Sequence, residues 1–358
     1  MSDEIQKLAS LSAEEADMSK IIGMMNHKGG CAKSSLTDAL AHRLVARGYI
    51  VLVADNDPQG NVSARFGLTN ETEFEDHRMN TFYEGLKKTN FSDKLIQMPI
   101  RVSSELLDSY PGALYLLPSH SESEHSAYSA RSVLGLKEGN KRYRDRFRFY
   151  GNYFNYTIID TGPAIHGNVS NEMTINAVDD AVIPFDGSEA VAGLNKFINW
   201  AVRNFDSTTP NAVFAMTKYQ CDTLDILRKL FDAMNLKTSS CSGERCCGSF
   251  RIMKNVLGNH VCDTGIPERR VLKNHTYDGL SNSYDIKRKY DKLSDEIIGK
   301  ISVKRENVFE LWQEGIFEKE LETLMMPLER GRHSNITHQF TATAFEGIAK
   351  VKSRFGLR

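Results

Sequence analysis

The chain has 358 residues, of which 41% are hydrophobic and 25% charged, so it can bury one large α/β core or two smaller ones. Its formal net charge of −1 gives no overall attraction to nucleic acid, and any DNA-binding surface must therefore be a local basic patch. The polar start lacks the blocks of a signal peptide and no apolar run approaches about 18 residues, so we expect a soluble, cytoplasmic protein.

The first segment with a clear pattern is residues 21–35, which predict a buried strand, a glycine loop and the first turn of a helix. Ile21 to Met25 is apolar on both faces, as a central parallel strand requires. The Gly29-Gly30 pair allows backbone amides to turn inward around an anion, beside a helix that begins near Lys33. Lys33 would reach the β- and γ-phosphates of a nucleotide, and the Ser34 hydroxyl would take a position on Mg²⁺.

The loop departs from the ordinary Walker pattern, G-x-x-x-x-G-K-[ST], because His27 and Ala32 stand at its two glycine positions. For Ala32 we expect an ordinary negative φ, since a left-handed backbone would cost about 1 kcal/mol or more there. A glycine turn with two solvated lysines is the alternative interpretation of K-G-G alone. The pattern that fits is K-G-G-x-x-K-[ST], filled by Lys28, Gly29, Gly30, Lys33 and Ser34.

A second strand follows a helix that Gly48 is placed to end. Residues 49–54 are an unbroken apolar run that leads directly into two carboxylates, Asp55 and Asp57. An Asp-Pro turn at the end of a strand is usually structural. Its separation from the phosphate loop by only one helix and one strand instead favours chemistry at this edge of the sheet.

Residues 154–160 predict a later apolar strand that ends in Asp160. Asp160 would hold Mg²⁺ through a water molecule opposite Ser34, and residues 161–163 would begin a loop that senses the γ-phosphate. Two more buried strands are predicted at residues 181–185 and 212–216.

Two other features have open interpretations. Residues 141–149 interleave five basic with three aromatic residues, a pattern that can bind nucleic acid; we favour a helix with a basic outer face and buried aromatics. Six cysteines match no standard zinc spacing. One interpretation is a metal site built from Cys241, Cys246, Cys247 and Cys262. The other is that these cysteines are free thiols in a reducing cytosol.

Taken together, the K-G-G-x-x-K-S loop, the D-x-D-P-Q-G-N segment and the strand ending in Asp160 resemble the ParA/MinD family of deviant Walker A ATPases, most of all the Soj-type ParA partition proteins. The resemblance implies an α/β fold, with a doubly wound, mostly parallel sheet flanked by helices. It covers about residues 20–301, which we take as the ATPase domain. Residues 1–19 would be a leader, and residues 302–358 a helical C-terminal extension.

The resemblance also implies roles for the motif residues. Lys28 would cross a dimer interface to the nucleotide of the partner subunit, Asp57 would orient the attacking water, and Asp55 would support the water shell of the metal. Catalysis would rest on Lys28, Lys33 and Asp57, and the metal would be held by Ser34, Asp55 and Asp160. The nucleotide site would comprise Lys28, Gly29, Gly30, Cys31, Ala32, Lys33, Ser34, Ser35, Asp55, Asp57 and Asp160.

The function implied is DNA partition with ATP and Mg²⁺ as cofactors. An ATP-dependent homodimer would bind DNA non-specifically at the nucleoid, and a ParB-like, cargo-bound activator would trigger slow hydrolysis and release. Residues 265–273 resemble the basic segment that the family uses near the nucleotide. The candidate DNA contacts there are Arg269, Arg270 and Lys273.

Two alternatives belong to the same superfamily. A MinD-like ATPase would bind membrane through residues 341–358, which form a basic amphipathic pattern; packing of this stretch on the domain or a partner is the favoured interpretation. An iron-sulfur protein like the nitrogenase iron protein needs ligand cysteines between the loop and the later strands. The chain has no cysteine from residue 32 to residue 220, which disfavours that class.

Overall fold

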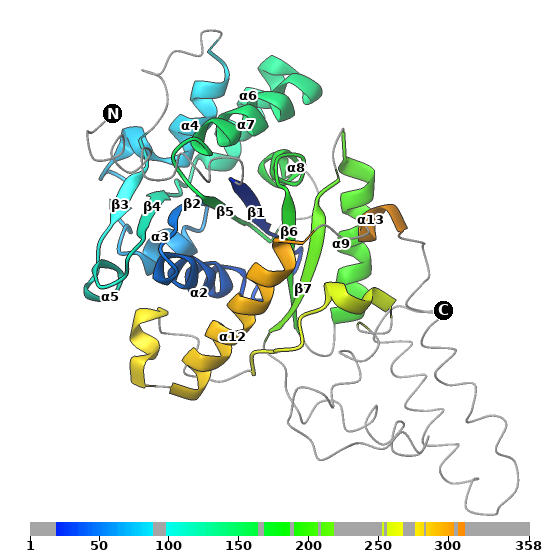
Figure 1. The fold of residues 1–358 in the computed structure, drawn as a ribbon. Coiled ribbons are helices and arrows are strands. Elements are labelled where there is room, and N and C mark those ends of the chain that lie inside the picture. The colour runs from blue at the N-terminus through cyan, green and yellow to red at the C-terminus, as the bar shows by residue number, and fades with distance from the viewer. Residues whose placement is uncertain are drawn as a thin grey trace, which may run out of the picture.

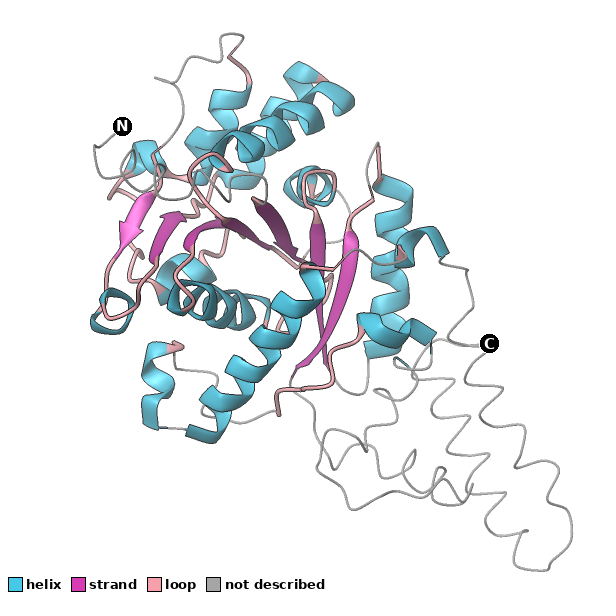
Figure 2. Cartoon of the chain, viewed as in Figure 1, coloured by secondary structure: helices cyan, strands magenta, loops and turns pink. Residues whose placement is uncertain are grey.

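The computed structural model describes residues 19–88, 98–163, 168–186, 190–206, 209–217, 253, 256–267, 276–282, 284–303 and 307–311. The strands in these ranges are β1 (Lys20–Met24), β2 (Ile50–Asn56), β3 (Ile100–Val102), β4 (Ala113–Leu117), β5 (Tyr156–Thr161), β6 (Asp180–Asp186) and β7 (Asn211–Thr217). They form one seven-stranded sheet in the order β3-β4-β2-β5-β1-β6-β7, with helices on both faces (Figure 1; Figure 2). Only the β3–β4 pair is antiparallel among these neighbours.

The central strands are mainly apolar, with polar residues gathered toward their carboxyl ends, because both faces of the sheet are covered. Every residue of β2 and every residue of β5 is buried. On β1, Ile22 and Met24 pack into one core and Ile21 packs into another on the opposite face. The predicted doubly wound, mostly parallel α/β sheet is therefore confirmed.

The helices divide between the two faces. One face carries α2 (Lys33–Ala46), α3 (Asn61–Arg65), α5 (Glu105–Asp108) and α12 (Tyr284–Ile301), with the 3-10 helix η8 (Asp278–Asn282) beside them. The other carries α4 (Met79–Leu86), α6 (Ser123–Leu134), α7 (Leu136–Tyr150), α8 (Val169–Ile175) and α9 (Ala190–Asn204). Shorter pieces are η2 (Glu75–His77), η6 (Gly258–His260) and α13 (Val308–Leu311).

The ends of α2 agree with the sequence expectations. The helix begins at Lys33, and Gly48 follows it with φ 92°, a conformation that favours glycine at a helix C-terminus. Later in the chain, Tyr290, Leu293 and Ile297 of α12 are buried, as their spacing predicts.

Helix α7 differs in one respect from the expected helix with a basic outer face and buried aromatics. Tyr143 and Phe147 are buried, as is Tyr150 just beyond, but Phe149 is only half-buried. Arg146 is buried with the first three instead of joining a basic outer face. The guanidinium donates to the backbone oxygen of Gly85 at 3.2 Å and lies over the ring of Phe82. Positions 143, 146, 147 and 150 form one helical stripe, so Arg146 had to point inward with the aromatics.

Parts of the predicted chain lie outside the described residues. These parts are residues 1–18 of the predicted leader and residues 312–358, including the amphipathic stretch 341–358, of the predicted extension. Among the helices that are described, none combines the length and the apolar character that crossing a membrane requires.

Candidate nucleotide-binding site

The loop after β1 wraps around the side chain of its own lysine. Lys33 is 6% exposed, and its ammonium donates to the backbone oxygens of Asn26 at 3.2 Å and Lys28 at 3.3 Å. The Asn26 side chain accepts from the Lys28 amide at 3.0 Å and donates to the backbone of Pro184 on β6. The loop is thus fixed at both ends, and Gly29 and Gly30 are exposed at its tip.

Ala32 adopts a left-handed backbone, so the expectation of a negative φ was wrong. Its φ is 67°, close to the 76° of Gly30, and the residue is the N-cap of α2. The chain must reverse sharply here, because the oxygen of Ala32 already accepts the first helical hydrogen bond, from Leu36. This geometry explains why the ordinary Walker pattern asks for glycine at the same position.

His27, at the other missing Walker glycine, packs into the protein. Its ring lies 5.0 Å from both Phe197 and Trp200 of α9, edge-on to each. Cys31 is also buried; its thiol donates to the Lys28 oxygen, and its backbone oxygen accepts from Thr217 on β7. Packing side chains therefore anchor the loop to β7 and α9.

The carboxylates meet where β2 and β5 run side by side. Asp55 and Asp160 are paired across the two strands, and both are fully buried. Asp160 accepts from the Ser34 hydroxyl at 2.8 Å and from Thr37 at 2.9 Å, while Ser63 donates twice to Asp55, from its amide and its hydroxyl, at 2.7 Å each. The sequence interpretation missed Thr37 and Ser63.

The two buried carboxyl groups influence each other's ionisation. Burial, and then the charge of Asp160, raise the pKa of Asp55 above its ordinary value. Burial also raises the pKa of Asp160, against the lowering effect of the Lys33 ammonium. Two carboxylates so placed are stabilised in their charged form by a cation between them.

Asp57 lies beside the loop that follows β5. It is 5% exposed, and one carboxylate oxygen accepts from the Gln59 amide at 3.0 Å. A Cβ on Gly162 would lie 3.5 Å from that oxygen, so the Asp57 carboxylate lies close to the backbone of the loop that follows β5. The backbone oxygen of Asp57 accepts from the Ser119 hydroxyl at the end of β4.

Asn56, between the two aspartates, faces the opposite side of the sheet. Its side chain is fully buried, accepts from the Tyr83 hydroxyl at 2.7 Å and donates to Thr174 at 3.1 Å. Tyr143 and the backbone oxygen of Ser170 lie farther away, at 3.4 Å. The end of β2 is therefore tied to α4, α7 and α8.

The candidate DNA contacts and most of the cysteines of the conceivable metal site lie outside the described residues. These are Arg269, Arg270 and Lys273 among the contacts, and three of the four cysteines. The fourth, Cys262, is buried.

Comparisons with known proteins agree with this arrangement. A family model described as an AAA domain matches residues 19–213, more than half of the chain. A protein of Rhizobium rhizogenes named as a replication protein A is 30% identical over 128 residues, 36% of this chain and 30% of that one. The chromosome partitioning protein ParA of Myxococcus xanthus is 28% identical over 172 residues, 47% of this chain and 53% of that one. The chain thus spans less than two thirds of the length of either relative.

Solved structures share the fold. A protein of Borrelia burgdorferi named as a plasmid partition protein, bound to AMPPNP, has a TM-score of 0.54 at 21% identity, over 79% of this chain and 99% of that one. The ParA of pNOB8, bound to nonspecific DNA, has a TM-score of 0.51 at 15% identity, over 80% of this chain and all of that one. At such identities the likeness concerns the fold alone. From the family match and the loop pattern, the chain belongs to the AAA domain family and carries the deviant Walker A loop of the ParA/MinD type.

Proposed function

We propose that this protein is a partition ATPase that uses ATP to switch between two DNA-binding states. The observation that carries the proposal is the meeting of Lys33, Ser34, Asp55, Asp57 and Asp160 around one glycine loop at the carboxyl ends of β1, β2 and β5. Ligands of parallel α/β sheets bind at this edge.

The residues of the site fit a nucleotide with its metal ion. Buried carboxylates and a serine hydroxyl are the oxygen donors that Mg²⁺ takes, so Ser34, Asp160 and Asp55 would hold it or its water molecules. When bound, Mg²⁺ neutralises charge on the phosphate oxygens. The Lys33 ammonium would then donate to phosphate oxygens in place of the backbone oxygens of Asn26 and Lys28. Asp57 would hold and orient the attacking water, because it lies against the loop that follows Asp160.

The two lysines of the loop differ in burial, because Lys33 is buried and Lys28 is half-buried. The Lys33 ammonium donates to backbone oxygens of its own loop, whereas Lys28 directly precedes the exposed glycines. We propose that Lys28 reaches the nucleotide of a second copy, so that two copies close face to face over two nucleotides. Hydrolysis would then open the dimer, and we expect it to be slow until an activator of the ParB kind, bound to cargo, stimulates it.

We propose non-specific DNA at the nucleoid as the macromolecular ligand. The pNOB8 ParA structure supports this ligand, because that protein is bound to nonspecific DNA. In this chain the contacts would come from Arg269, Arg270 and Lys273, in the segment just before residues 276–282. Basic residues that contact phosphates give salt-sensitive, sequence-independent binding.

The test is binding to random duplex DNA in ATP, in ADP and without nucleotide, each over a range of salt concentrations. We expect tight, salt-sensitive binding with ATP only, retained without turnover in Asp57→Ala, and weakened at least tenfold by Arg269→Glu with Arg270→Glu. The matched control reverses two exposed lysines of α7, Lys137→Glu with Lys141→Glu. Binding that ignores ATP, or that the α7 pair weakens as much as the arginine pair, would refute the proposal.

A further inference from the structure

One face of the nucleotide-loop helix α2 is polar where a helix packed in a core is normally apolar. Ser35, Asp38 and His42 follow each other at spacings of three and four residues, which places them on this face. Asp38 and His42 are 1% and 2% exposed. The two side chains pair with each other, with His42 Nδ1 3.1 Å from an Asp38 oxygen, and other elements supply further partners.

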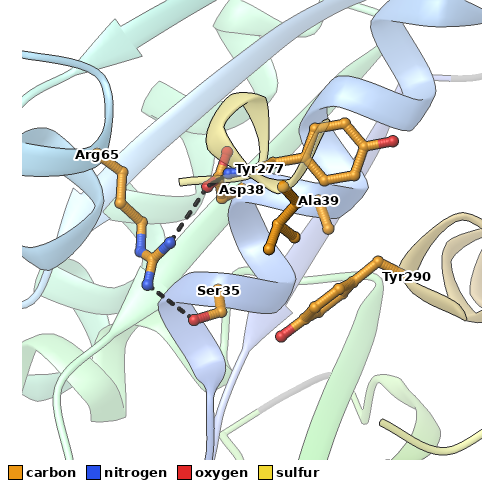
Figure 3. Close-up of a pocket in the computed structure, with 7 residues that line it drawn as sticks. Ser35, Asp38, Ala39, Arg65, Tyr277 and Tyr290 are labelled. Carbon is orange, nitrogen blue, oxygen red and sulfur yellow. Dashed lines mark hydrogen bonds and ion pairs between the residues drawn. The ribbon is translucent and has the colours of Figure 1, made fainter. Parts of the chain in front are cut away.

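The first partner is Arg65, the last residue of α3. One guanidinium nitrogen donates to the Ser35 hydroxyl at 2.8 Å, and another lies 3.3 Å from Asp38 (Figure 3). Figure 3 shows the Arg65 side chain reaching across to the first turns of α2, beside a small hollow that Tyr277 and Tyr290 also line.

The second partner is the segment that leads into α12. Asp38 accepts from the backbone amide of Tyr277 at 2.9 Å, through the same oxygen that faces Arg65. His42 lies 2.7 Å from the carboxylate of Asp278. The position of residues 276–282 is therefore set by the polar face of α2.

Helix α3 joins this face to the metal-site carboxylates. Ser63 donates two hydrogen bonds to Asp55, and Arg65, two residues later, contacts Ser35 and Asp38. Arg65 thus lies between the phosphate loop and the amide of Tyr277, and it competes with that amide for one oxygen of Asp38.

We propose that Arg65 is a positioning residue through which residues 276–290 respond to the nucleotide; this inference rests on nucleotide binding at the proposed site. Phosphates bound at the start of α2 bring negative charge next to Ser35 and draw the guanidinium away from Asp38. Asp38 then accepts more strongly from Tyr277, and the segment tightens onto α2. The candidate DNA contacts Arg269, Arg270 and Lys273 precede this segment in the sequence.

The experiment is hydrogen exchange on the full chain, with and without saturating AMPPNP and Mg²⁺. In the wild type, we expect AMPPNP to slow exchange in residues 276–290 by about fivefold or more. In Arg65→Ala, exchange there should be the same with and without AMPPNP, even though a separate titration shows the nucleotide bound. Arg65→Lys, which keeps the charge, should restore part of the response.

The matched control is Arg131→Ala on the opposite face of the sheet. Arg131 pairs with Glu172, and its side chain is 18% exposed against 19% for Arg65. This variant should keep the wild-type response. A full response in Arg65→Ala, or bound AMPPNP without any response in the wild type, overturns the inference and leaves the proposed function standing. Failure of the wild type to bind AMPPNP overturns both.

Discussion

At the scale of single residues, Ala32 has a left-handed backbone, a conformation that a residue with a Cβ adopts only with strain. The residue has φ 67° at the entry of α2, and an L-residue in this region carries about 1–2 kcal/mol of strain. Backbone strain of this kind persists when the surrounding contacts fix the chain. Here they are the first hydrogen bond of the helix and the buried side chain of Cys31.

We therefore predict that Ala32→Gly stabilises the protein. Glycine removes the strain but adds backbone freedom to the unfolded chain, which leaves a net gain of about 0.5 kcal/mol in the free energy of unfolding by urea. Ala46→Gly, in the last turn of α2, is the control and should destabilise, because that position has helical geometry. Equal effects of both substitutions would contradict the left-handed assignment.

The fold also changes the ionisation of the buried His42. Burial alone would lower its pKa, but hydrogen bonds and charges from Asp278 and Asp38 outweigh burial and raise the pKa from 6.5 to about 9. The folded protein therefore holds a proton that the unfolded chain releases near pH 6.5. This stabilisation is complete below pH 6.5 and is lost as the pH rises through about 9.

The prediction is that His42→Gln flattens the pH dependence of stability. Between pH 6.5 and 9, the difference in unfolding free energy between wild type and variant should shrink by about 3 kcal/mol, measured by urea denaturation. His125→Gln, at an exposed position of α6, should keep the wild-type profile. A variant at position 42 with that same profile would show that the imidazole is not charged in the fold.

At the scale of elements, the end of β2 is held from both faces of the sheet. Ser63 of α3 bonds Asp55 on one face, and Tyr83 and Thr174 bond Asn56 on the other. Thr174 belongs to α8, where Asn171 also donates to the backbone oxygen of Gly162 at 3.1 Å. One helix thus holds both loops that border the carboxylate of Asp57.

Asn56→Ala should therefore destabilise the fold by about 3 kcal/mol, because it leaves the buried Tyr83 and Thr174 hydroxyls without their partner. Urea denaturation measures this loss. Asn61→Ala, at an exposed position of α3, is the matched control and should change stability by less than about 0.5 kcal/mol. A loss at position 56 no larger than the control would mean that the network contributes little.

The elements also show why part of the site could be predicted from the sequence and part could not. Strands β1, β2 and β5 are mainly apolar runs that end at the phosphate loop or at carboxylates, so pattern and spacing were enough to predict them. Thr37 reaches Asp160 of β5 from α2, Ser63 reaches Asp55 of β2 from α3, and Arg65 of α3 reaches Ser35 of α2. These contacts join elements that are separate in the sequence, and no local pattern encodes them. The left-handed backbone of Ala32 comes from the sharp reversal at the entry of α2, and the Walker pattern already required glycine there.

At the scale of the whole molecule, the sheet order gathers the functional segments at one edge. Strand β1 lies between β5 and β6, and β2 lies next to β5, so the loops after β1, β2 and β5 meet although they are far apart in sequence. In the loop after β1, Gly29 and Gly30 are exposed and Lys28, next to them, is half-buried. A face that presents a lysine next to its own phosphate site suits a second copy placed against it.

Dimerisation through Lys28 is the prediction that belongs to this scale. With saturating AMPPNP and Mg²⁺, light scattering after gel filtration should show a dimer for the wild type and a monomer for Lys28→Ala, because each nucleotide then lacks the partner's ammonium. Lys28→Ala should still bind AMPPNP, whereas Lys33→Ala should bind it at least tenfold more weakly, since Lys33 lies within its own loop. If Lys28→Ala dimerises like the wild type, the lysine acts within one subunit and the face-to-face arrangement needs another contact.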